Sequence, residues 1–237
     1  MATSPTGGGD RRLRSLWLGR VAYGRALAWQ EQARRANAEV GDLLLLLEHD
    51  PVYTTGRLGA PEHLPPPGAA RGVPVFRIAR GGDATFHGPG QLVGYPIVDL
   101  RARGRDVHAF LRAIERALIA TLADLGVPAR TWTGRTGVWV PGAPPRKIAS
   151  IGIGVRRGIS LHGLALNVTV DLSRFDAIVP CGLRGVEMTS IERERPGSAP
   201  PLKRVAALAA AHLAGALGAD GSFEEARGGV ASALRLP

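Results

Sequence analysis

The chain has 237 residues, and its content of 45% hydrophobic and 21% charged residues is typical of one large globular domain or two small ones. No apolar run approaches the roughly 20 residues that cross a bilayer, so we predict no transmembrane segment and no membrane partner. The formal net charge is +10, but the arginines form only short clusters without interleaved aromatic residues, which argues against a nucleic-acid partner.

The N-terminal part is expected to begin with a disordered leader over residues 1–12. Its first residues are rich in Ser, Thr, Pro and Gly, without the basic start and apolar stretch of a signal peptide. Residues 19–40 are rich in Ala, Arg, Gln and Glu and contain no proline, which predicts a helix that ends at Gly41. The apolar run over residues 43–48 predicts a buried strand, followed by a loop over residues 49–72.

Runs of apolar and β-branched residues between glycines and prolines predict further strands. Their expected positions are residues 73–79, 91–100, 138–140, 147–155 and 159–170. A glycine-rich loop, Arg80–Gly90, joins the first two of these strands. A tight turn at Arg156-Arg157-Gly158 makes the last two a hairpin.

One helix has the clearest pattern in the chain, with Asp106 as its cap and Gly126 at its end. Its apolar residues follow the three-and-four spacing of one buried face, and they are Val107, Phe110, Leu111, Ile114, Leu118, Leu122 and Leu125. Another helix is expected after Pro200-Pro201, and the tail over residues 218–237 is expected to be partly ordered. Strands and helices without a regular βαβ alternation predict an α+β fold, with a single catalytic domain over residues 13–217.

The rarest reactive side chains are Cys181 and Lys147. Cys181 is the only cysteine and stands between Pro180 and Gly182, which suits a presented nucleophile, although a lone cysteine is more often a buried small hydrophobe. Lys147 is one of two lysines among 30 basic residues. A nearby ammonium favours the thiolate, so the pair suits nucleophilic catalysis. A single thiol cannot form an internal disulfide, which fits a reducing cytoplasm.

The loop Arg80–Gly90 concentrates glycine and polar residues between two predicted strands. This composition permits close approach of the backbone to a ligand, although it also fits a wide turn. The Walker pattern is absent, and residues 152–158 miss the dinucleotide glycine spacing by one residue. The six histidines are dispersed and no H-E-x-x-H occurs, so we predict neither a metal site nor a cofactor.

Several motifs follow one another along the chain. They are His87-Gly88-Pro89-Gly90-Gln91-Leu92 within residues 80–96, the stretch Lys147–Gly152, the triplet His162-Gly163-Leu164 leading into Asn167-Val168, and Pro180-Cys181-Gly182 followed by Thr189-Ser190. An earlier stretch, Glu48–Thr54 with Gly56-Arg57, accompanies them. Over residues 43–191 the chain closely resembles the lipoyl(octanoyl) transferases.

The resemblance implies an enzyme that takes an octanoyl group from octanoyl acyl carrier protein. The implied acceptors are specific lysines on the lipoyl domains of 2-oxoacid dehydrogenase E2 subunits and on the glycine cleavage H protein. The implied fold is that of the biotin and lipoate protein ligases, a mixed sheet flanked by helices. Cys181 would form the acyl thioester, and Lys147 would lower the pKa of its thiol. The implied acyl-binding residues are Arg80, Gly81, Gly82, Asp83, Ala84, Thr85, Phe86, His87, Ser150, Ile151, Gly152, His162, Gly163 and Leu164.

Two other interpretations stay open from the sequence. A lipoate or biotin protein ligase would share the fold and the lysine but activate a free acid with ATP, and Cys181 together with the residues 87–90 favours the transferase. A non-catalytic basic binding protein would have no need of Cys181. For His87 and His162, a structural role fits the sequence as well as a role in orienting the reacting groups.

Overall fold

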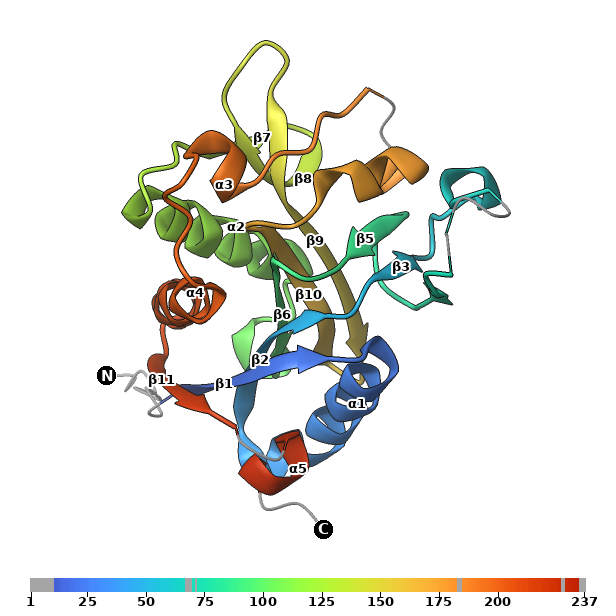
Figure 1. Cartoon of the computed structure of the whole chain (residues 1–237). Helices are drawn as coiled ribbons and strands as arrows, with labels where there is room; N and C mark the ends of the chain where they lie inside the picture. The colour runs from blue at the N-terminus through green and yellow to red at the C-terminus, as the bar shows by residue number, and fades with distance from the viewer. Residues whose placement is uncertain (1–10, 67–69, 71, 183–184, 227–228, 235–237) are drawn as a thin grey trace.

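The structure is a computed structural model that describes residues 11–66, 70, 72–182, 185–226 and 229–234, and the side chain of Cys181 lies outside this description. Within the described residues an eight-stranded mixed sheet organises the fold (Figure 1). In spatial order its strands are β11 (Asp220–Glu225), β1 (Arg12–Val21), β2 (Asp42–His49), β6 (Gln91–Ile97), β10 (Ile159–Asn167), β9 (Arg146–Arg156), β8 (Arg135–Val140) and β7 (Arg130–Trp132). Strand β1 pairs in parallel with both β11 and β2, and the other pairings are antiparallel.

A second, smaller sheet stands beside the first (Figure 1). Its central strand β3 (Val52–Thr55) pairs in parallel with β4 (Val75–Arg77) and antiparallel with β5 (Thr85–His87). Short 3-10 helices complete the connections, and they are η1 (Pro61–His63), η2 (Arg101–Arg103), η3 (Leu172–Ala177) and η4 (Pro180–Gly182).

Helices cover both faces of the main sheet (Figure 1). Helices α2 (Val107–Asp124) and α4 (Leu202–Ala216) pack on one face, and α1 (Tyr23–Val40) packs on the other. In β2, Leu44 and Leu46 point to the first face while Leu43, Leu45 and Leu47 point to the second. The unbroken leucine run is therefore explained, because a strand covered on both sides has no polar face.

The smaller helices α3 (Ile191–Glu194) and α5 (Gly229–Leu234) precede α4 and follow β11, respectively. No helix in the described part of the chain combines the length and apolar character needed to span a bilayer. The predicted α+β fold is confirmed.

The elements with strong local signals were predicted correctly. Asp106 caps α2 by accepting a hydrogen bond from the backbone N–H of Ala109 at 2.9 Å. The turn between β9 and β10 has positive φ at Arg157 (52°) and Gly158 (82°), as a two-residue hairpin requires. Helix α4 starts directly after Pro201.

Several elements differ from the sequence-based expectation. Strand β1 already begins at Arg12 and occupies residues that were expected to be leader and helix. Its pairing with β2 shifts between Trp17 and Arg20, and Gly19 lies there with φ 66°, so this irregularity breaks the period-two pattern. The short strands β3 and β5 lie in segments expected to be loops, and β11 lies in the tail. Residues 1–10 are outside the described residues.

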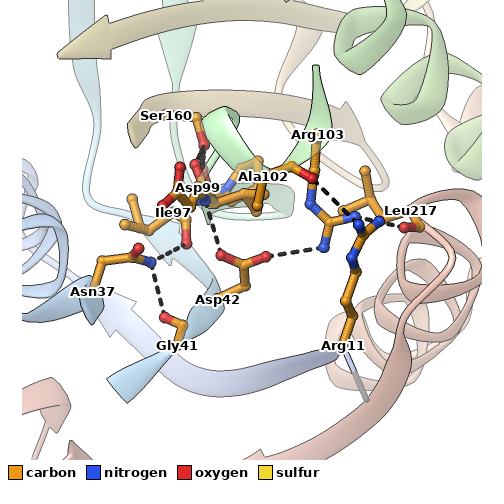
Figure 2. A network of polar contacts seen from close by, with 12 residues as sticks. Arg11, Asn37, Gly41, Asp42, Ile97, Asp99, Ala102, Arg103, Ser160 and Leu217 are labelled. Carbon is orange, nitrogen blue, oxygen red and sulfur yellow. Dashed lines mark hydrogen bonds and ion pairs between the residues drawn. The ribbon is translucent and has the colours of Figure 1, made fainter. Parts of the chain in front are cut away.

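Asp42 lies at the centre of a polar network where α1 ends and β2 begins (Figure 2). Its Oδ2 accepts a hydrogen bond from Arg103 Nη2 at 2.9 Å, and its Oδ1 accepts one from the backbone N–H of Asp99 at 2.8 Å. Arg103 also donates from Nη1 to the carbonyl of Leu217 at 2.6 Å. These charge-assisted bonds join β2, the connection from β6 to α2, and the end of α4.

We predict that Asp42→Ala lowers the free energy of unfolding by about 2 kcal/mol, because it leaves a largely buried guanidinium without its carboxylate. Urea denaturation measures the loss. Arg35→Ala is the control, since Arg35 pairs with Glu31 on the surface and its removal is expected to cost less than about 0.5 kcal/mol. Equal stability of the two variants would contradict a stabilising role for the Asp42 network.

Candidate functional site

The glycine-rich segment after β4 lies directly against β9. The backbone N–H of Gly81 donates to the carbonyl of Ile153 at 2.9 Å. A Cβ on Gly152 would lie 2.8 Å from Gly81 O, and one on Gly154 would lie 2.8 Å from Ala79 O. The glycines at positions 152 and 154 of β9 therefore allow this backbone-to-backbone approach, which side chains there would prevent.

A cavity lies between this segment and the face of the sheet that α1 covers. Most of the residues implied to bind the acyl group line it, and these are Arg80, Gly82, Asp83, Thr85, His87, Ser150, Ile151, Gly152, His162, Gly163 and Leu164. Gly81, Ala84 and Phe86 do not line it. Ala84 and Phe86 pack instead in a separate apolar cluster with Tyr53 and Phe175, because successive side chains of a strand point to opposite faces.

The cavity has further walls that sequence reasoning missed, namely Tyr23, Ile78, Val93, Tyr95 and Ala165. Val93 and Tyr95 had a usable signal, because they alternate in a predicted strand and so share a face. Tyr23 comes from α1, and no local pattern indicates which residues of a helix meet a distant loop. As the side chains stand, the open space is about 50 Å³.

A chain of buried hydrogen bonds starts at the cavity. Arg80 Nη2 donates to Thr54 Oγ1 at 3.0 Å and to the carbonyl of Thr54 at 3.2 Å. Thr54 Oγ1 lies 3.4 Å from His87 Nε2, and His87 Nδ1 lies 2.7 Å from Gln91 Oε1. Because an amide oxygen only accepts, His87 carries its proton on Nδ1, and its Nε2 accepts from the threonine hydroxyl.

The same series of hydrogen bonds continues to the backbone of Lys147. Gln91 Nε2 donates to Asn167 Oδ1 at 2.9 Å, and Asn167 Nδ2 donates to the carbonyl of Thr189 at 2.9 Å. The backbone N–H of Thr189 donates to the carbonyl of Lys147, also at 2.9 Å. Residues from all four sequence motifs are thus joined in one hydrogen-bonded path.

Lys147 is almost completely buried, with 2% of its surface exposed. Its Nζ lies 5.2 Å from the centre of the Trp139 ring, within the range of a cation–π interaction. A Cβ on Gly137 would lie 2.9 Å from Lys147 Cε, so glycine at this position makes room for the lysine side chain. The backbone N–H of Lys147 donates to the carbonyl of Glu187 at 2.8 Å. Backbone pairing and side-chain packing both fix the position of this lysine.

The backbone around Cys181 forms the short helix η4, close to the cavity. A Cβ on Gly182 would lie 2.7 Å from Oδ2 of Asp83, which lines the cavity. The chain then returns to β9, where Met188 forms a parallel bridge with Lys147. The contact expected between the Cys181 thiol and Lys147 involves a side chain outside the described part and stays a prediction.

Burial keeps the histidines near the cavity neutral. The pKa of His49 falls to about 4 through burial, although its ring is held between the carbonyl of Val21 and the hydroxyl of Tyr95, each at 2.7 Å. Burial lowers the pKa of His87 to about 3 and that of His162 to about 4, with a smaller contribution from the Arg80 charge in both cases. These histidines therefore add no charge to the cavity, whose lining also contains the charged side chains of Arg80 and Asp83.

Known structures define the class of the fold. The match to the archaeal bi-partite lipoate protein ligase of Thermoplasma acidophilum covers 95% of this chain and 91% of the ligase chain, with a TM-score of 0.72 at 20% identity. Lipoate-protein ligase A bound with ATP has a TM-score of 0.70 at 21% identity, covering 96% of this chain and 93% of its own. The biotin protein ligase of Aquifex aeolicus has a TM-score of 0.54 at 12% identity, covering 86% and 70%. The fold is that of the lipoate and biotin protein ligases.

Sequence relatives narrow the class to one family. Residues 22–214 match the model of the lipoyl protein ligase A/B catalytic domain. The octanoyltransferase of Geobacter metallireducens is 51% identical over 176 residues, covering 73% of this chain and 79% of its own. The octanoyltransferase of Geobacter sulfurreducens is 48% identical over 215 residues, covering 90% and 88%. The chain belongs to the lipoyl(octanoyl) transferase family, whose members transfer octanoyl groups for protein lipoylation.

We predict that the free energy of unfolding falls as the pH is lowered from about 6.5 to about 4. The buried His49 stays neutral in the folded state down to pH 4 while the unfolded chain is already protonated near pH 6.5, so stability is full above this window and is lost within it. The slope contributed by one histidine is about 1 kcal/mol per pH unit. Urea denaturation at pH 4.5 and at pH 5.5 gives the free energy of unfolding at each pH. The difference between the two values should be smaller in His49→Gln than in the parent protein, and equal differences would contradict the role of His49.

Proposed function

We propose that this transferase takes the octanoyl group from octanoyl acyl carrier protein, holds it as a thioester on Cys181, and passes it to a lysine of a lipoyl domain. The acceptors we propose are the lipoyl domains of 2-oxoacid dehydrogenase E2 subunits and the glycine cleavage H protein, in the cytoplasm. The observation that carries the proposal is the hydrogen-bonded path from the cavity to Lys147, because it joins the proposed binding space to a buried, positioned lysine.

The chemistry proceeds by two exchanges at one carbonyl. The Cys181 thiolate attacks the donor thioester, the bond to the phosphopantetheine sulfur breaks, and the leaving thiolate takes up a proton. The neutral amine of the acceptor lysine then attacks the Cys181 thioester, an amide forms, a proton leaves the nitrogen, and Cys181 departs as thiolate. The first exchange replaces one thioester with another and is close to isoenergetic, and the second converts a thioester into a more stable amide, so ATP is not consumed.

Lys147 has two roles in this scheme. As an ammonium it favours the thiolate form of Cys181 and supplies a proton to the leaving phosphopantetheine thiolate. Having given up that proton, it accepts one from the attacking amine in the second step, which restores the starting state. Trp139 and Gly137 support these roles by holding the lysine side chain in place.

The acyl chain has to enlarge the cavity to enter it. Sites for ligands of this kind usually offer about 300 Å³ or more, well above the 50 Å³ of open space here. The small sheet and its glycine-rich segment form one wall, and among the described strands those of the small sheet pair only with one another. Outward movement of this wall, with loss of the Gly81–Ile153 hydrogen bond, provides the room.

Intact-mass measurement of the protein after incubation with octanoyl acyl carrier protein tests the covalent step. We predict a mass gain of one octanoyl group without ATP, and its transfer to an apo lipoyl domain added afterwards. Cys181→Ser should form no stable adduct, whereas Ser222→Ala, an exposed change on β11, should behave like the parent. A strict ATP requirement would instead assign a ligase reaction.

For Lys147→Arg we predict a folded protein in which octanoylation slows by about 100-fold or more, because the charge persists while the geometry and the capacity to act as a base are lost. Single-turnover mass spectrometry gives the rate, and circular dichroism checks the fold. Lys203→Arg changes the second lysine, which pairs with Glu225 at 2.7 Å on the surface, and should leave the rate unaltered. Equal rates in the two variants would remove Lys147 from the mechanism.

A further inference from the structure

The cavity shares a wall with a second, outer groove. This groove has a volume of about 480 Å³, and among the described residues it shares only Ile78 and His162 with the lining of the cavity. The apolar side chains Leu27, Val155 and Leu161 line the groove, and Val155 is 44% exposed. The charged residues Glu31, Arg57, Arg77 and Arg156 also line the groove. His162 and Ile78 therefore stand between a narrow, buried space and a wider one whose lining includes an apolar stretch.

The order of residues along β9 shows that His162 lies at the far end of the cavity. The glycine-rich segment runs antiparallel to β9, with Ala79 beside Gly154 and Gly81 beside Gly152. Continued in this direction, the segment places Asp83 near Ser150. Asp83 is also the cavity residue next to the backbone of Gly182. The cavity thus begins near η4 and ends near His162.

The length of this path matches the proposed acyl group. His162 pairs with Ile153, three residues beyond Ser150 on β9. At about 3.4 Å per residue, the distance from Ser150 to this pair is roughly 10 Å, close to the length of an extended eight-carbon chain.

His162 has two features that are unfavourable for stability. Its φ is 59°, a left-handed conformation that is uncommon for residues other than glycine. Its Nδ1 is buried without a hydrogen-bond partner among the described residues, and the residue is only 6% exposed. The ring edge lies against β9, where a Cβ on Gly154 would approach Cδ2 to 3.1 Å. Such features tend to persist at functional positions.

We infer that His162 sets the acyl-chain length of this enzyme by closing the distal end of the cavity against the outer groove. The inference rests on the proposed function, in which the cavity holds the acyl chain. Without the imidazole the cavity and the groove become continuous, and carbons beyond the eighth can lie on Leu27, Val155 and Leu161.

His162→Gly tests this, because glycine accepts the positive φ without strain. Octanoyl, decanoyl, dodecanoyl and tetradecanoyl carrier proteins are offered separately, and the rate of adduct formation on the enzyme is followed by intact mass. We expect the ratio of the dodecanoyl to the octanoyl rate to rise by roughly tenfold or more in the variant. An unchanged ratio overturns the inference. If the parent protein forms no octanoyl adduct, the proposed function itself fails.

Two further variants distinguish a cavity that has become continuous with the outer groove from one that has only lost packing around His162. Val155→Trp added to His162→Gly fills the outer groove and should abolish the gain with dodecanoyl, and a gain that persists overturns the assignment. Ile78→Ala removes the other shared wall residue and should shift the ratio in the same direction, which keeps the test available if His162→Gly folds poorly. A shift toward shorter chains in Ile78→Ala would contradict the inference.

Discussion

The hydrogen bond between Gln91 and Asn167 is the contact on which the site depends. It joins β6 to β10 through side chains, and its two residues also reach outward in opposite directions. Toward the cavity, Gln91 orients His87. Toward β9, Asn167 donates to the carbonyl of Thr189, whose N–H donates to the carbonyl of Lys147. Each amide uses both its oxygen and its nitrogen, so loss of either residue leaves buried polar groups unpaired on both sides. The arrangement explains why motifs so far apart in the chain occur together.

Much of the fold follows from local signals in the sequence. The cap at Asp106 and the apolar spacing after it define α2, the turn at Arg157 and Gly158 defines the β9–β10 hairpin, and the leucine run defines β2. Strand β1 has no such signal, because the irregularity near Gly19 interrupts its alternation. Its partner β11 is exposed, short of apolar residues and about 200 positions away, so their pairing depends on the assembled sheet.

The candidate site, like the fold, is predicted in part by local sequence signals and depends in part on long-range packing. The motifs contain most of the cavity lining and indicate its position between the glycine-rich segment and the hairpin. What they lack are residues placed by packing, such as Tyr23 from α1 and Trp139 from β8. The sequence also gives no sign that Phe86 points away from the cavity while Thr85 and His87 point into it, since that depends on the short strand β5 inside the expected loop.

The parallel pairing of β11 with β1 has a consequence for self-association. Strand β11 occupies the last position on its side of the described sheet and covers the backbone of Arg12–Trp17 (Figure 1). Two of its carboxylates tie it to neighbouring elements, since Glu224 pairs with Arg14 on β1 and Glu225 pairs with Lys203 on α4. A chain cut before Asp220 would lose these ion pairs and leave the backbone amides of β1 unpaired on that side. The C-terminal segment therefore covers an edge strand to which another chain could otherwise add a strand, quite apart from any part in octanoyl transfer.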